Sequence, residues 1–256
     1  MLPTRLEIIP TKDIVPAAVA QLPPGITLTV TCLSHHGIER TMETAVALAG
    51  HGFTVVPHLA ARAIESREQL AGILGECSAA GITEVFAIGG DAAVPAGPFG
   101  TSADLLREIA ELTGRTMKVG VAGYPEGHPA IGGSQLLDDL VAKAELADHI
   151  VTQMCFSGST IADYIAGLRR DGVVLPVWAG VVGTVPRTKL LALATKIGVG
   201  SSLKFISGKA ALGRSLLSGS RYQPGQLVSE LAALQEPPAG IHLYTFNSLT
   251  PLPASS

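Results

Sequence analysis

The chain has 256 residues, of which 47% are hydrophobic and 15% are charged, so it can bury a sizeable core. Its net charge of −3 lacks the basic footprint of a nucleic-acid-binding protein, and its apolar runs are interrupted before they reach membrane-spanning length. Three widely separated cysteines give no disulfide or zinc framework, and no basic and apolar leader opens the chain. We therefore expect a cytoplasmic protein that binds neither nucleic acid nor a membrane.

Short segments rich in Val, Ile and Leu recur along the whole chain. Most are too continuous in their hydrophobicity to be half-exposed strands, which favours parallel strands buried on both faces. The predicted strands cover residues 5–9, 26–32, 54–58, 84–88, 118–122, 149–153, 174–180 and 241–246.

Helical segments alternate with these strands. Ser66 and Gln69 fit a capping box, Ser102 and Ser159 are candidate N-caps, and Gly81 and Gly172 stand where helices commonly end. The predicted helices cover residues 14–21, 39–50, 66–80, 102–112, 134–146, 159–170, 187–196 and about 224–234.

Eight strand–helix pairs in 256 residues predict a (β/α)8 barrel, in one domain over residues 1–256. An open, doubly wound sheet remains the alternative, because alternation alone does not show closure. The segment 198–223 is long enough to carry an extra helix, and the tail at 251–256 is expected to be disordered.

Polar side chains stand in or just after most of the predicted strands. In a (β/α)8 barrel the carboxyl ends of the strands converge on one mouth, where ligands are handled. We therefore expect these residues to share a site: Glu7, Thr31, His58, Asp91, Tyr124, His128, Gln153 and Tyr244. Glu126 also follows the fifth strand but is expected to face solvent or to cap the turn.

Glu7 is the strongest catalytic candidate, because glutamate is rarely buried without a purpose. Burial penalises a charged carboxylate, and a general acid must hold its proton until it reacts. Structural roles remain open for the others: Asp91 could be a turn residue, and His58 and His128 could be satisfied core histidines. We expect no metal site, since the adjacent histidines of the Ser34-His35-His36-Gly37 sequence have no partner at ligand spacing.

Several segments resemble, in order, those of the methylenetetrahydrofolate reductase family. The more specific are the Tyr-Pro-Glu-Gly-His-Pro sequence from Tyr124 and the Thr-Gln pair at Gln153. Weaker ones are Leu-Glu-Ile-Ile-Pro around Glu7, Val-Pro-His-Leu around His58, Ile-Gly-Gly-Asp ending at Asp91, Val-Thr-Cys around Thr31 and Leu-Tyr-Thr-Phe-Asn around Tyr244. The resemblance implies a (β/α)8 barrel.

The resemblance also implies an activity, the reduction of 5,10-methylenetetrahydrofolate to 5-methyltetrahydrofolate. Glu7 resembles the family's acid, which opens the imidazolidine ring, and Asp91 resembles the acid that lies beside the pterin. Gln153 resembles a folate-contacting amide. On the same basis, Thr31, His58, Tyr124, His128 and Tyr244 are expected to line the redox cofactor's site.

The chain departs from the family where most members bind a flavin. Gly89 stands where they carry arginine, and Val141 and Ala142 stand where they carry basic residues that hold the flavin's phosphates. The adjacent Lys143 is turned by about 100° around a helix, which makes it a poor substitute. We therefore expect no tightly bound FAD. The chain resembles the flavin-independent branch, in which NADH or NADPH reduces the folate directly.

Three other functions remain open at the level of the sequence: the same reaction with bound FAD, a folate-binding barrel that transfers a methyl group, and a non-catalytic folate- or nucleotide-binding relative. The choice between NADH and NADPH is also open, as is assembly into a homo-oligomer.

Overall fold

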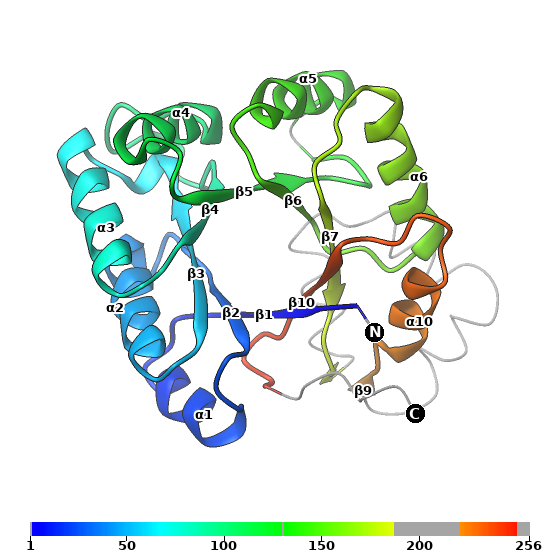
Figure 1. Ribbon diagram of the computed structural model, residues 1–256, viewed down its shortest axis with the longest axis horizontal. Helices are drawn as coiled ribbons and strands as arrows, with labels where there is room; N and C mark the ends of the chain where they lie inside the picture. Colours follow the sequence, from blue (N-terminus) through cyan, green and yellow to red (C-terminus); the bar gives the residue numbers. More distant parts are fainter. Residues whose placement is uncertain (1, 130, 187–220, 250–256) are drawn as a thin grey trace.

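Eight parallel strands close into one barrel, as the sequence predicts, and helices cover its outside (Figure 1). The computed structural model describes residues 2–129, 131–186 and 221–249. Closure excludes the open, doubly wound sheet. Around the ring the strands are β1 (Thr4–Ile8), β2 (Thr27–Val30), β3 (Thr54–Ala60), β4 (Glu84–Ile88), β5 (Lys118–Gly123), β6 (His149–Thr152), β7 (Val177–Val182) and β10 (Gly240–Tyr244), which pairs with β1.

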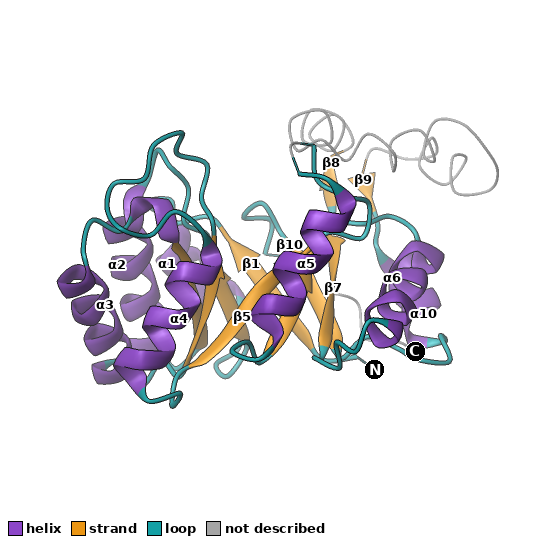
Figure 2. Cartoon of the chain, turned by 90° about the horizontal axis from the view of Figure 1, so that it is seen from above, coloured by secondary structure: helices purple, strands orange, loops and turns teal. Residues whose placement is uncertain are grey.

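The helices lie outside the strands, and Figure 2 shows them flanking the barrel from the side. In the part of the chain that the structure describes, none is long and apolar enough to cross a bilayer. They are α1 (Ile14–Gln21), α2 (Gly37–Gly50), α3 (Arg67–Ala79), α4 (Ser102–Thr113), α5 (Gly133–Ala144), α6 (Gly158–Arg170) and α10 (Gly225–Ala232), with a 3-10 turn at Ala61–Ala63.

A small antiparallel sheet that the sequence does not predict pairs β8 (Val185–Pro186) with β9 (Arg221–Tyr222). It stands beyond the carboxyl end of β7 (Figure 2), where Tyr222 packs edge-on against Phe156. The predicted helix at 187–196 and the tail at 251–256 lie outside the described residues, as does most of the segment 198–223.

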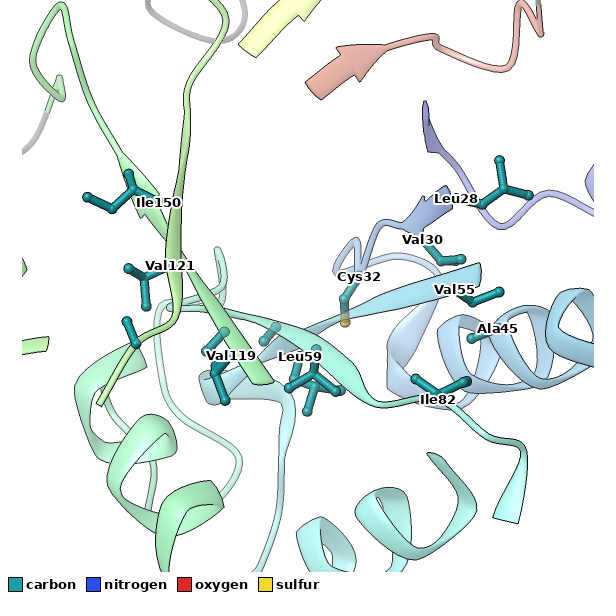
Figure 3. Close-up of a cluster of buried hydrophobic side chains, with 14 of the residues drawn as sticks. Leu28, Val30, Cys32, Ala45, Val55, Leu59, Ile82, Val119, Val121 and Ile150 are labelled. Atoms are coloured by element: carbon teal, nitrogen blue, oxygen red, sulfur yellow. The ribbon is translucent and has the colours of Figure 1, made fainter. Parts of the chain in front are cut away.

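The main core lies between the strands and the helices. Side chains of a strand alternate between its two faces, and the outward set here is aliphatic and almost fully buried. Leu6 and Ile8 of β1, for example, are 3% and 0% exposed. Figure 3 shows part of this layer, including Leu28 and Val30 of β2 and Ala45 of α2.

The inward set of side chains is different, because it carries charge. At the end of the barrel where the strands begin, Arg5 of β1 pairs with Glu84 of β4, and His149 of β6 contacts both. Val56, Phe86 and Val151 form a separate apolar cluster. The barrel interior is therefore filled with side chains below its mouth, as is usual for this fold.

Two predicted helix caps are wrong by one or two residues. Thr101, not Ser102, caps α4: its hydroxyl accepts from Asp104 N at 3.2 Å, and the Asp104 carboxylate accepts from Thr101 N. Ser157, not Ser159, caps α6. Ser66 does cap α3, and both Gly81 and Gly172 follow helix ends with positive φ, as predicted.

Several strand boundaries also differ from the prediction by one to three residues, and two of these differences have a clear cause. The seventh strand starts at Val177 and not at residue 174, because Pro176 cannot donate to a ladder and Val174 is 77% exposed. The eighth ends at Tyr244 and not at residue 246, because Phe246 and Asn247 have φ of 49° and 64°. These positive φ angles turn the chain away from the sheet.

Candidate active site

A cavity of about 900 Å³ opens at the carboxyl ends of the barrel strands. This volume lies near the upper end of the range of small-molecule sites, about 300–1,000 Å³. Strands from both halves of the barrel contribute to its wall. The described lining residues are Glu7, Ile9, Thr11, Thr31, Leu33, Ser34, His35, His36, Asp91, Tyr124, Pro125, Glu126, Gly127, His128, Pro129, Gln153, Met154, Tyr244 and Phe246.

Glu7 reaches this cavity from near the carboxyl end of β1, and its side chain is 15% exposed. Its Oε2 lies 2.9 Å from His242 Nε2 and 3.8 Å from His58 Nε2. Its backbone carbonyl accepts from Thr245 Oγ1 at 2.6 Å. The carboxyl group is therefore fixed on the cavity floor with one oxygen held by a histidine.

His58 lies beneath Glu7, is 5% exposed, and is not among the residues that line the cavity. Its ring packs 4.8 Å from Phe86. Burial lowers the pKa of His58 to about 4, opposed by attraction to Glu7 and reinforced by repulsion from His242. The imidazole is thus neutral at physiological pH, and its Nε2 is buried without a hydrogen-bond partner.

Tyr244 crosses the mouth from β10, and its hydroxyl donates to the backbone carbonyl of Thr152 at 2.9 Å. Gly180 makes this possible, since a Cβ there would lie 2.2 Å from the Thr152 carbonyl oxygen and 2.9 Å from the Tyr244 ring. Burial raises the pKa of Tyr244 well above its usual value, and Glu7 and Tyr124 add to the effect. Tyr244 is therefore a neutral wall of the cavity.

The loop after β5 supplies a second aromatic wall. Tyr124 lies edge-on to His128 with ring centroids 5.1 Å apart. Burial, with a contribution from Asp91, raises the pKa of Tyr124. Behind the loop, Cys155 Sγ donates to Glu126 Oε1 at 3.3 Å, and burial raises the pKa of this thiol to about 12.

Gln153 and Thr31 offer polar groups to a ligand from opposite sides. The Gln153 side-chain oxygen accepts from Met154 N at 2.8 Å, which leaves its NH₂ group to donate into the cavity. Thr31 is 7% exposed, and its hydroxyl is buried without a partner at the cavity wall. An unpaired buried hydroxyl is costly, so a ligand that bonded it would recover that cost.

Asp91 stands at the exposed rim, in the loop after β4. Arg62 holds this loop by donating to the carbonyls of Ala92 at 2.9 Å and Gly100 at 3.0 Å. The clamp explains how an acid three residues beyond the end of its strand is kept at the cavity mouth.

The structure thus brings most of the predicted site residues to one cavity: Glu7, Thr31, Asp91, Tyr124, His128, Gln153 and Tyr244. Glu126, which was expected to face solvent or to cap the turn, also lines this cavity. His58 lies just below it, against Glu7. The sequence interpretation missed His242, which is 1% exposed and contacts Glu7. Its signal was its position two residues before Tyr244, on the same face of the same strand.

Among the described residues that line the cavity there is no lysine or arginine. Lys143 Nζ lies 3.4 Å from Ser102 Oγ of α4, and burial lowers the pKa of this amine. Val141 is 42% exposed, and a Cβ at Gly89 would meet nothing within 4 Å. The described lining of the cavity therefore supplies no cation that could pair with a flavin's phosphates. No group of three metal-ligating side chains occurs among the described residues either.

Together, the fold and the cavity define a (β/α)8-barrel protein with a ligand-sized cavity into which a partly buried glutamate projects. The sequence profile of the methylenetetrahydrofolate reductase family matches residues 16–200. The chain therefore belongs to the methylenetetrahydrofolate reductase family.

A curated relative and two solved structures are similar to the chain. A Caenorhabditis elegans protein described as a probable methylenetetrahydrofolate reductase (NADPH) is 29% identical over 121 residues, which is 43% of this chain and 17% of that protein. The chain thus spans about a sixth of that relative. An oxaloacetate acetylhydrolase matches with a TM-score of 0.51 at 11% identity over 71% of this chain and 67% of its own. A phosphonomutase candidate from Burkholderia cenocepacia matches with the same score and identity over 95% and 87%. These two structures support the fold alone.

Proposed function

We propose that this protein reduces 5,10-methylenetetrahydrofolate to 5-methyltetrahydrofolate, with NADH or NADPH as the direct hydride donor. Membership of the family supports folate reduction. The observation that carries the proposal is Glu7, a carboxyl group fixed on the floor of a ligand-sized cavity.

In the first step Glu7 acts as a general acid. Its O–H bond breaks and the proton goes to the folate nitrogen that leaves the methylene carbon, so the imidazolidine ring opens. The products of this step are a glutamate carboxylate and an iminium cation at N5 of the pterin. No other redox group is needed to reach this state.

In the second step the iminium carbon accepts a hydride from C4 of the nicotinamide, which leaves the oxidised dinucleotide and the methyl group. The barrel contributes mainly by holding the two carbons in contact with water excluded. Asp91 and Gln153 bind the folate in this proposal. We assign the nicotinamide side of the cavity to Thr31, Tyr124, His128 and Tyr244, which all line it, with His58 beneath.

Direct transfer is proposed because, among the residues that the structure describes, the positions at which most family members hold the flavin carry no free charge. Gly89, Val141 and Ala142 offer no charge, and Lys143 is engaged with α4. A dinucleotide that enters and leaves in each cycle can be bound more weakly than a resident cofactor.

The proposal is tested by mixing purified protein with NADH or NADPH and methylenetetrahydrofolate, and by following nicotinamide oxidation and methyl product together. We expect stoichiometric product, a protein without flavin absorbance, and initial-rate lines that intersect, as a ternary complex requires. Parallel lines with a yellow protein would indicate a flavin-containing reductase. Folate binding without nicotinamide oxidation would point to the non-catalytic or methyl-transferring alternatives.

A further inference from the structure

The acid on β1 has a partner that no part of the reaction described above uses. His242 lies on β10, in register with Arg5 and two residues before Tyr244. It is 1% exposed and does not line the cavity, so it cannot touch a ligand. Its Nε2 lies 2.9 Å from Glu7 Oε2, closer than the 3.8 Å that separates this oxygen from His58 Nε2.

The other ring nitrogen shows which way this hydrogen bond points. His242 Nδ1 is buried and has no partner in the described structure. A buried N–H without an acceptor is rarer in proteins than an unpaired acceptor. The proton is therefore best placed on Nε2, from which it is donated to Glu7, while Nδ1 keeps only its lone pair.

The groups around His242 leave this N–H as the main support for a charged Glu7. From β3, His58 lies 3.8 Å from the same carboxyl oxygen but is neutral. From β10, the Tyr244 ring packs edge-on to His242 with centroids 4.9 Å apart, and its hydroxyl is turned to Thr152. From β1, Arg5 is committed to Glu84, and His149 of β6 lies with that pair.

We propose that His242 is a positioning residue that holds Glu7 Oε2 and stabilises the carboxylate formed when Glu7 gives its proton to the substrate. This inference rests on the proposed function. The described residues provide no hydrogen bond to Oε1, so Oε1 is the oxygen that faces the substrate. As the O–H bond at Oε1 breaks, negative charge develops on the carboxyl group. The hydrogen bond that His242 Nε2–H donates to Oε2 then becomes stronger. The proton on His242 does not move; Glu7 regains its own proton from water when the product leaves the cavity.

The test compares His242→Leu, which removes the donor, with His242→Gln, which keeps an N–H group near the position of Nε2. We expect His242→Leu to lower kcat about 10- to 100-fold, the loss of one hydrogen bond to a charge, while KM for NADH or NADPH changes little. Without the donor, proton loss from Glu7 is less favourable, so the alkaline limb of the kcat–pH profile moves to higher pH. His242→Gln should recover much of kcat and return the limb toward its wild-type position.

The matched control is His149→Leu, which removes another buried barrel histidine that does not contact Glu7. It should keep the wild-type kcat and pH profile, with thermal unfolding measured for every variant. The inference is overturned if His242→Leu keeps wild-type kcat, or if the leucine and glutamine variants fall equally with an unmoved pH limb.

A second readout separates this inference from the proposed function. The ¹⁵N shifts of the His242 ring, assigned by comparison with the variants, report its tautomer without any turnover. A protonated Nε2 and a bare Nδ1 support the inference even if the wild-type protein oxidises no NADH or NADPH, a result that would remove the proposed function alone. Protonation at Nδ1 would overturn the inference in an active enzyme.

Discussion

Arg5 of β1 and Glu84 of β4 form a bidentate ion pair across the inside of the barrel. The Arg5 guanidinium also lies over the Trp178 ring, with Cζ 3.9 Å from its centroid, and His149 Nε2 lies 3.3 Å from Glu84 Oε1. The two charged side chains are only 13% and 15% exposed. The barrel is therefore closed below its cavity by a charged layer in which each member depends on the others.

Breaking this ion pair on one side should destabilise the protein strongly. We expect Arg5→Met or Glu84→Met to lower the free energy of unfolding by about 3–5 kcal/mol, because each leaves a buried charged partner uncompensated. The double variant Arg5→Met with Glu84→Met should be closer to wild type than either single variant. Urea unfolding of the four proteins checks this, and additive losses in the double variant would contradict it.

Replacing Glu7 tests the proposed acid. Glu7→Gln keeps the shape of the side chain but carries no acidic proton, so turnover should fall by about 10²- to 10⁴-fold. NADH binding and the thermal midpoint should change little, because glutamine can still hydrogen-bond His242. Full turnover in this variant would rule out Glu7 as the proton donor.

A methyl group at Gly180 should disturb both the fold and the cavity. The Cβ that Gly180→Ala introduces would lie far inside contact distance of the Thr152 carbonyl and the Tyr244 ring, so the backbone must shift, at a cost of about 1–3 kcal/mol. Activity should fall with it, since Tyr244 walls the site. Gly72→Ala, at an exposed site in α3 with nothing within 4 Å, is the control and should stabilise by up to about 1 kcal/mol. Equal effects of the two changes would contradict this account.

The buried histidines should make the fold sensitive to acid. Burial holds the pKa of His58 at about 4, against an ordinary value of 6.5, and lowers that of His149 to about 3. Below pH 6.5 the unfolded chain therefore binds protons that the folded chain does not, and stability falls as the pH drops from 6.5 toward 4. Each histidine should lower the free energy of unfolding by about 2 kcal/mol when the pH falls from 7 to 5. Urea unfolding at pH 7 and pH 5 measures this loss of stability, which should be smaller in His149→Leu. Equal stability of the wild-type protein at the two pH values would refute the prediction.

The fold could be predicted from the sequence because both faces of each barrel strand are buried, so the strands appear as short, nearly continuous apolar runs. The boundaries were less accurate where one residue outweighed the pattern. Pro176 delays the start of β7, and the positive φ angles of Phe246 and Asn247 end β10 early. The capping residues of α4 and α6 were missed because neighbouring Ser and Thr residues compete for the same role.

Most of the site could be predicted because its residues stand at equivalent places in successive strand–loop units. His242 was missed although it shares a strand face with Tyr244, since a single histidine inside an apolar strand more often belongs to the core. Its contact with Glu7 joins residues 235 positions apart. The charged layer of Arg5, Glu84 and His149 could not be predicted either, because its three members come from three separate strands.

Asn247 holds together the chain ends of β1 and β10, the first and last strands of the barrel, which pair with each other. Its side chain accepts from Ile9 N at 2.8 Å and donates to Ile9 O at 3.0 Å. Glu7 of β1 and His242 of β10 contact each other between the same two strands. During synthesis the acid is made 235 positions before the histidine that holds it in place. If the proposed function holds, the acid and its histidine come together only when the barrel closes, so turnover per molecule would report the fraction of closed barrels in a preparation.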